Sequence, residues 1–155
     1  MSTEPAGHVA ESVAAARTEE QARQAALALI ENCGIGMVGS NGPDGFPQIK
    51  ALLKNGSDGL KTVWFSTNTS SQRVPQLLAD PKSSVYFVDV INYQGLMLLG
   101  TTEVLDDQES RERAWRYGNE LYYPQGVDDP DYSVLRFTAQ RGRYYQGLKS
   151  TTFDI

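Results

Sequence analysis

Cysteine and histidine are almost missing from this sequence of 155 residues, which contains one of each. The single cysteine, Cys33, excludes an internal disulfide and any metal or cluster site built from several cysteines. The single histidine, His8, lies in a leader rich in small residues, where we expect a solvated side chain. A catalytic triad, a cysteine–histidine pair and a histidine-ligated zinc or haem are therefore excluded from the core of one chain. Chemistry is expected to reside on a bound group, with no catalytic side chain.

Positive charge and long apolar runs are also scarce. The chain has 14 Lys and Arg against 19 Asp and Glu, a net charge of −5, whereas nucleic-acid binding depends on basic side chains that neutralise phosphates. No apolar run approaches the roughly 18 residues needed to span a membrane, and the N-terminus lacks the organisation of a signal peptide. We therefore predict a cytoplasmic protein that binds neither nucleic acid nor membrane. Residues 1–17 are expected to form a flexible leader before a single domain, residues 18–155.

The hydrophobic periodicity predicts short strands with a few helices between them. One helix is expected over residues 18–33, beginning at a capping box of Thr18 and Gln21. Two more are expected over residues 71–79 and 107–117, the latter after a capping box of Asp106 and Glu109. Runs with strand character, separated by turns such as NGPDGFP and NGSDG, occupy residues 35–40, 48–54, 62–66, 84–89, 96–105, 133–139 and 143–148. This pattern predicts a mainly β fold with connecting helices, an antiparallel barrel or sandwich.

The segment LMLLG, residues 96–100, is apolar at successive positions, and VYFVDV shows the same continuity. Both faces of such a strand are expected to be covered. A small barrel fills its inside with one face, so the other face is left either for a second subunit or for the helices of the same chain.

Two motifs suggest ligands that their context does not support. GIGMVG, residues 34–39, matches a dinucleotide fingerprint, but that fingerprint needs a strand before it and a helix after it, and here a helix precedes and a turn follows. The acidic cluster DDPDY, residues 128–132, lacks the spacing of a calcium loop and is better interpreted as a solvated turn. No metal site is predicted.

The segment FSTNTSSQRVPQLLAD, residues 65–80, places Arg73 in the first turn of a predicted helix, where the helix dipole disfavours a cation. Hydroxyl groups of Thr67 and Ser71 lie close by in the sequence. Free amides, hydroxyls and a guanidinium together favour an anion, so the segment predicts a phosphate site. The alternative is that Ser71 only caps the helix while Arg73 faces solvent. Pro75 disfavours helical geometry at the residue before it, so the sequence does not define the first residue of this helix.

A second basic residue favours the phosphate site. On PQIKALLK, alternation places Lys50 and Leu52 on one face of a strand and Ile49, Ala51 and Leu53 on the other. If this strand neighbours residues 62–66 through a hairpin at NGSDG, then Lys50 reaches the same anion. The expected ligand carries a phosphate and is large enough to lie along a strand.

These residues also carry a resemblance. FPQIKALL, VWFSTNTSSQRVPQLLADPKSSVYFVD, GLMLLGTTEVLDD and YYPQGVDDPDYSVLRFTAQRGRYYQGL resemble the pyridoxamine 5'-phosphate oxidase-like FMN-binding split-barrel family, and most of all its general stress protein 26 group. The resemblance covers roughly residues 27–148. It implies a six-stranded antiparallel split β-barrel that forms a homodimer, with an FMN at each end of the subunit interface.

The resemblance also implies a set of cofactor-binding residues, which is Lys50, Ala51, Leu52, Thr67, Ser71, Gln72, Arg73, Gln94 and Tyr145. The first three would lie along the flavin, with Lys50 reaching the ring or its phosphate. The next four would surround the phosphate, and Gln72 stands where the oxidases have a second basic residue. Gln94 or its neighbours, and Tyr145, would approach the flavin from the other subunit.

The C-terminal tail departs from the oxidase pattern. YYQG resembles the oxidase motif Phe-Trp-Gln-Gly with Tyr145 in place of Trp, and Thr151 and Phe153 stand where the oxidases hold their vitamin substrate with Arg and His. Oxidation of pyridoxamine 5'-phosphate is therefore not expected. The resemblance implies a flavin-dependent oxidoreductase of unknown substrate. The alternatives are a flavin-binding module without turnover, a reductase that uses the deazaflavin F420, or a protein that binds FAD.

Overall fold

The computed structural model describes residues 16–155, so most of the predicted leader, residues 1–17, lies outside the described residues. Its helices are α2 (Glu19–Asn32), α3 (Arg73–Ala79) and α4 (Gln108–Ala114), and 3₁₀ turns follow at Asn119–Leu121 and Gly126–Asp128. Its strands are β1 (Ile35–Asn41), β2 (Pro47–Asp58), β3 (Thr62–Asn68), β4 (Lys82–Asp89), β5 (Gln94–Leu105), β6 (Tyr132–Gln146) and β7 (Lys149–Asp154). No helix within this part of the chain is both long and apolar enough to cross a bilayer.

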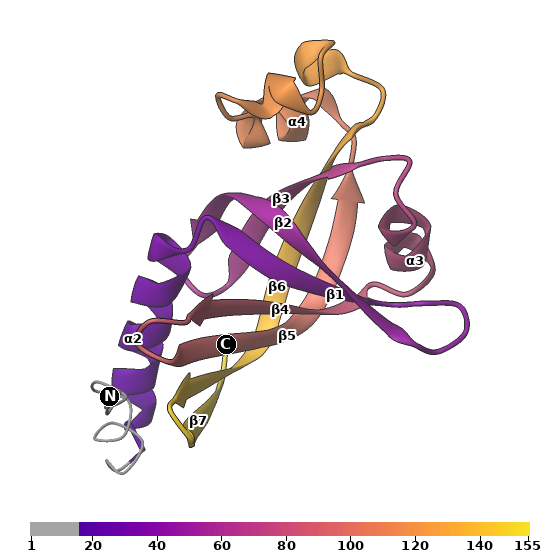
Figure 1. The fold of residues 1–155 in the computed structure, drawn as a ribbon. Coiled ribbons are helices and arrows are strands. Elements are labelled where there is room, and N and C mark those ends of the chain that lie inside the picture. Colours follow the sequence, from indigo (N-terminus) through magenta and orange to yellow (C-terminus); the bar gives the residue numbers. More distant parts are fainter. Residues whose placement is uncertain (1–15) are drawn as a thin grey trace, which may run out of the picture.

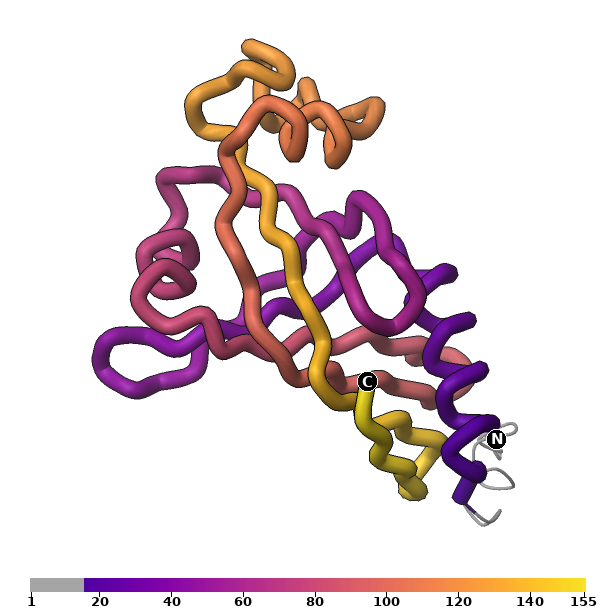
Figure 2. Tube along the Cα trace, turned by 180° about the vertical axis from the view of Figure 1, so that it is seen from behind, coloured from indigo at the N-terminus to yellow at the C-terminus, as the bar shows by residue number. Residues whose placement is uncertain are grey.

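The strands form a closed antiparallel barrel, as predicted. They hydrogen-bond in the order β3-β2-β1-β4-β5-β6, and β3 pairs again with β6 to complete six strands. The last strand, β7, extends the sheet from β6 only. Figure 1 shows α2 along one side of the barrel, α3 on the opposite side, and α4 with the following loop above one end. From behind, β6 runs from that loop past the whole barrel to β7 (Figure 2).

The first helix forms as its sequence predicts. Thr18 accepts a hydrogen bond from the backbone of Gln21, and the Gln21 side chain accepts one from the Thr18 backbone, so the capping box is complete. Apolar residues of α2 cover the barrel core, and four of them are buried: Ala22, Ala26, Leu29 and Ile30.

Several predicted boundaries are wrong. NGSDG is not the turn between β2 and β3, because β2 continues to Asp58 through a bulge between Lys54 and Gly56. The Asn55 side chain donates a hydrogen bond to Ser66 Oγ on β3, which satisfies a buried amide at this irregularity. Residues 133–139 and 143–148 belong to one strand, β6, rather than two.

The shorter helices begin one or two residues later than predicted. Asp107, not Asp106, caps α4 by accepting a hydrogen bond from the Ser110 backbone, and α4 ends at Ala114. The N-cap of α3 is Gln72, and no side chain caps that helix. The interpretation of Ser71 as a cap is therefore wrong.

The apolar strand LMLLG fills the barrel with one of its faces, as predicted, and what covers its other face stays a prediction. Leu96 and Leu98 are fully buried inside the barrel of their own chain, whereas Met97 and Leu99 are half-buried on its outer face. A separate cluster lies under the loop after α4, where the ring of Tyr132 packs between Trp115 at 5.2 Å and Tyr123 at 4.9 Å. This cluster fixes the loop beside β3 and so positions one wall of the site described next.

Candidate anion and cofactor site

A cavity of about 520 Å³ opens between β2, the end of β3, the start of α3 and the loop after α4. Its size falls in the range of roughly 300–1,000 Å³ that is typical of small-molecule sites. Of the predicted residues, those that line it are Lys50, Ala51, Leu52, Thr67 and Arg73. The structure therefore brings five of the nine predicted residues to one cavity, from three different elements.

Arg73 is the main charge in this cavity. Its Nε and Nη2 donate hydrogen bonds of 3.3 and 3.1 Å to Thr67 Oγ1, and its side chain is partly buried. Among residues 16–155, Arg73 has no carboxylate within ion-pair distance. Burial lowers the pKa of the Arg73 guanidinium, with an opposing effect from Tyr123, yet an arginine stays protonated in proteins. The site thus holds a partly desolvated cation without a counter-ion.

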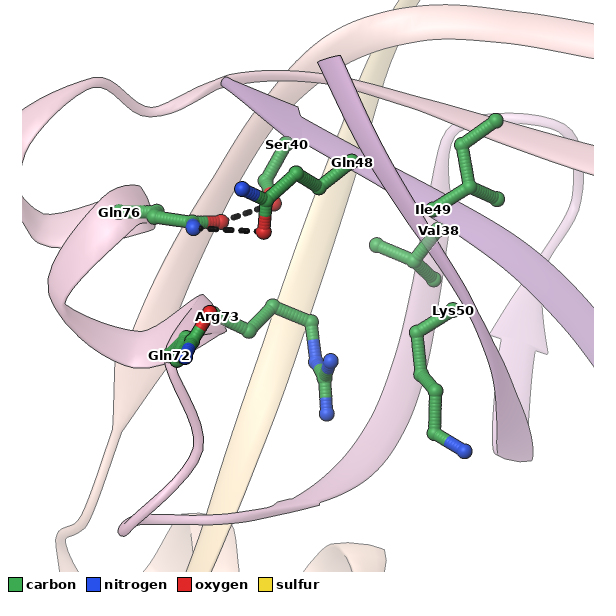
Figure 3. Close-up of a pocket in the computed structure, with 8 residues that line it drawn as sticks. All are labelled: Val38, Ser40, Gln48, Ile49, Lys50, Gln72, Arg73 and Gln76. Atoms are coloured by element: carbon green, nitrogen blue, oxygen red, sulfur yellow. Dashed lines mark hydrogen bonds between the residues drawn. The ribbon is translucent and has the colours of Figure 1, made fainter. Parts of the chain in front are cut away.

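Lys50 adds a second positive charge beside the first. Figure 3 shows Lys50 on β2 and Arg73 on α3 with their charged ends on the same side, while Ile49 points away. Both residues also line a smaller cavity of about 260 Å³. An anion bound in these cavities would be attracted by both cations.

Ser71 lies two residues before Arg73 and has an unsatisfied hydroxyl, but it is not among the residues that line either cavity. Its Oγ is buried, and no group in residues 16–155 hydrogen-bonds to it. A buried polar atom without a partner costs about 1–3 kcal/mol, so such atoms often indicate a missing ligand. Because α3 has only seven residues, the case for an anion depends on Arg73, Lys50 and Ser71 rather than on the helix dipole.

Gln72, Gln94 and Tyr145 lie elsewhere. Gln72 is exposed and lines the smaller cavity beside Arg73. Gln94 begins β5 opposite Gln146, and the ring of Tyr145 packs 6.4 Å from that of Tyr86. Neither Gln94 nor Tyr145 lines the 520 Å³ cavity. Their contact with a cofactor would have to come from a second chain, and it stays a prediction.

Tyr123 lines the cavity, although it is not one of the nine predicted cofactor-binding residues. It lines the cavity with Tyr122, Asn119 and Asp131. Burial, followed by the charge of Asp131, raises the pKa of Tyr123 to about 12, so its hydroxyl is a neutral hydrogen-bond donor at pH 7. The stretch LYYP could be interpreted as core or as a ligand platform, and Tyr123 belongs to both the aromatic cluster and the cavity.

The acidic residues of DDPDY hold the loop rather than a cation. Asp129 accepts hydrogen bonds from the backbones of Gln125 and Asp131, and Asp131 accepts one from the Ser70 backbone. Within residues 16–155, no three His, Cys, Asp or Glu side chains are grouped to hold a metal ion.

Residues 22–146 match the family model described as pyridoxamine 5'-phosphate oxidase. The chain belongs to this family. It is 48% identical to a solved Clostridium acetobutylicum protein related to general stress protein 26 of Bacillus subtilis, of the pyridoxinephosphate oxidase family. That alignment covers 89% of this chain and 97% of the other, with a TM-score of 0.84.

More distant solved structures share the fold. General stress protein 26 from Bacillus anthracis is 11% identical, with a TM-score of 0.73 over 86% of this chain and 98% of the other. A heme binding protein from Mycobacterium smegmatis is 18% identical, with a TM-score of 0.71 over 90% of this chain and 60% of the other. No curated protein sequence matches the chain.

Proposed function

We propose that the protein binds FMN and acts as a flavin-dependent oxidoreductase. The observation that carries this proposal is the anion site: Arg73, which has no carboxylate partner, and Lys50 both line the 520 Å³ cavity, and the unpartnered Ser71 Oγ lies two residues before Arg73 in the chain. Charge-assisted hydrogen bonds from a guanidinium suit a phosphate group well. Membership of the pyridoxamine 5'-phosphate oxidase family supports a flavin as the phosphate-bearing ligand.

When bound, the flavin supplies the redox chemistry, and the chain supplies binding and orientation. Arg73 and Lys50 neutralise the phosphate, while Thr67 fixes the direction of the guanidinium. Ala51 and Leu52 on β2 and Tyr123 on the loop after α4 line the same cavity and would contact the flavin there. No side chain of the site is assigned a proton transfer, because hydride chemistry at a flavin needs none from the protein.

We further propose a homodimer with the flavin at the subunit interface. An outer apolar face runs across β2, β1, β4 and β5, and its members are Ile35, Met37, Ile49, Ala51, Leu53, Tyr86, Met97 and Leu99. Ile35 pairs with Leu53 and Met37 with Ala51, so these side chains stand together on the outside of the barrel. Ile49 is 73% exposed. A contiguous exposed apolar patch of this kind indicates an interface. In an isologous contact, the patch of one chain would be buried against the same patch of a second chain.

The deciding experiment is a titration of the purified full-length chain with FMN, followed by absorbance and flavin fluorescence. Stoichiometric binding supports the proposal. If F420 or haem displaces FMN in a competition titration, that molecule becomes the assigned cofactor instead of FMN. Steady-state NAD(P)H oxidation by the loaded protein then tests the enzyme assignment. Bound flavin without turnover for any electron donor would make the protein a flavin-binding module.

A further inference from the structure

The hydroxyl group of Tyr123 is buried without a hydrogen-bond partner. The residue is only 7% exposed, and within residues 16–155 no group forms a hydrogen bond with its Oη. Two other buried tyrosines have a partner: Tyr132 donates to the carbonyl of Arg111 at 3.1 Å, and Tyr144 donates to Gln146 Oε1 at 3.0 Å. Because buried polar groups are almost always hydrogen-bonded, the exception at Tyr123 indicates a partner that the chain itself does not supply.

Packing holds the Tyr123 ring at the wall of the 520 Å³ cavity. The ring lies 4.9 Å from that of Tyr132 and 6.4 Å from that of Trp115. The backbone is held as well, because the Tyr123 N–H donates to the carbonyl of Asn119 at 2.9 Å and its carbonyl accepts from Gly126 at 3.0 Å. Tyr123 lines the cavity, whereas Trp115 and Tyr132 do not. The aromatic cluster therefore anchors the ring on one side, and the side chain meets the cavity on the other.

The surroundings of the hydroxyl keep it a hydrogen-bond donor. Burial, followed by the charge of Asp131, raises the pKa of Tyr123 to about 12, although Arg73 acts in the opposite direction. Arg73 and Asp131 line the same cavity as Tyr123, so two of the charges that act on the hydroxyl belong to this cavity. Asp131 Oδ1 already accepts a hydrogen bond from the Ser70 backbone at 2.8 Å. The cavity thus contains a protonated phenol with one hydrogen bond to donate.

Three donors from three parts of the chain line this cavity: Lys50 on β2, Arg73 on α3 and Tyr123 on the loop after α4. Among residues 16–155, Lys50 has no hydrogen bond or ion pair, and Arg73 has no carboxylate partner. A phosphate monoester presents three terminal oxygens, and each is a strong acceptor. The phosphates of FAD and F420 each have only two terminal oxygens, because both are esterified or bridged at a second oxygen. The number of donors therefore matches a monoester.

We propose that Tyr123 determines which flavin the site accepts, because its hydroxyl donates to the third terminal oxygen of the FMN phosphate held by Arg73 and Lys50. The inference rests on the proposed flavin site and extends it to the choice among flavin cofactors. With FMN, each of the three donors meets a terminal oxygen. With FAD or F420 one donor is left without such an oxygen, and a buried donor without a partner costs affinity.

The test is a fluorescence titration of full-length wild type and Tyr123→Phe with FMN, FAD and riboflavin. Phenylalanine keeps the ring in the aromatic cluster and removes only the hydroxyl. The dissociation constant of FMN should rise about tenfold, as expected for the loss of one hydrogen bond to a charged group, while those of FAD and riboflavin should change less than about twofold. Tyr117→Phe is the matched control, because Tyr117 is 99% exposed after the same helix and does not line the cavity.

The outcomes separate this inference from the flavin proposal. If Tyr123→Phe binds FMN as tightly as wild type, the inference is overturned and the flavin proposal is intact. An equal loss of all three flavins would also overturn it, because the hydroxyl would then be only structural. If the variant does not fold, the wild type decides: a preference of about tenfold for FMN over FAD supports the inference, and equal affinities overturn it. Failure of wild type to bind FMN would overturn both proposals.

Discussion

Thr67 Oγ1 accepts two hydrogen bonds from Arg73, one from Nε at 3.3 Å and one from Nη2 at 3.1 Å. A guanidinium has five N–H groups, so this contact aligns the side chain and leaves most of its donors directed at the cavity. Thr67 is only 2% exposed and lies at the end of a paired strand, which makes the contact rigid. An oriented cation is a better phosphate ligand than a mobile one, because less entropy is lost on binding.

Replacing Arg73 by Ala should therefore weaken FMN binding selectively. A hydrogen bond to a charged group contributes roughly 1.5–3 kcal/mol, so the dissociation constant should rise about 10- to 150-fold. Riboflavin, which lacks the phosphate, should bind wild type and variant alike. Arg136→Ala is the control, because Arg136 pairs with Glu103 at 2.8 Å on the barrel surface. An equal loss for both ligands would show that Arg73 is only structural.

Ile49→Asp should dissociate the proposed dimer and release flavin at the same time. The change places a carboxylate in the outer apolar face, where it would have to be buried against the partner subunit. Light scattering gives the mass, and a flavin titration on the same sample gives the binding. Leu78→Asp serves for comparison because Leu78 is equally exposed on α3. A monomeric wild type that binds FMN stoichiometrically would refute the shared site.

Stability should fall at alkaline pH because of Tyr123. Its pKa is about 12 in the folded chain against an ordinary value of 10.0, so the folded state holds the proton more tightly. The contribution of this proton to the free energy of unfolding is complete below pH 10 and is lost as the pH rises toward 12. Urea unfolding between about pH 9 and pH 11 should show a steeper decline for wild type than for Tyr123→Phe. Parallel curves would contradict the assignment.

Pyridoxamine 5'-phosphate should not be oxidised at a useful rate by the FMN-loaded protein. By the resemblance, Thr151 and Phe153 stand where the oxidases hold this substrate with Arg and His. Thr151 Oγ1 donates to the carbonyl of Arg17, and Phe153 is buried at 3% exposure under the guanidinium of Arg23. Neither side chain is available to a substrate. Aldehyde formation from pyridoxamine 5'-phosphate would be measured directly, and a robust rate would overturn this expectation.

Local patterns predicted the parts of the fold that local forces determine. The capping box at Thr18 and the alternation that places Lys50 on the same strand face as Leu52 depend on neighbours within a few residues. β7 was missed because its residues are mostly polar, and only Phe153 packs into the core. Its pairing to β6 is a property of the assembled sheet, which no pattern within residues 149–154 reveals.

The residues of the candidate site were likewise predictable only where they lie close together in the sequence. Arg73 and Thr67 are six residues apart, so the sequence could suggest their association. Asn55-Gly56 has the composition of a turn, but a side-chain hydrogen bond from Asn55 to Ser66 on the neighbouring strand keeps it extended. Asp131 and Tyr123 reach the cavity only because the aromatic cluster around Tyr132 folds their loop back over β3.

Closure of the barrel has a consequence for the order of folding. Thr62 pairs with Thr138 and Asn68 with Tyr132, so the β3–β6 ladder joins segments 64 to 76 residues apart along the chain. Contacts this distant in sequence form slowly, because a long loop must be ordered before they stabilise anything. The 520 Å³ cavity is lined by the end of β3 and by Asp131, which comes directly before β6, so its wall depends on this ladder. A ligand that binds there binds only the closed barrel and therefore stabilises it by mass action.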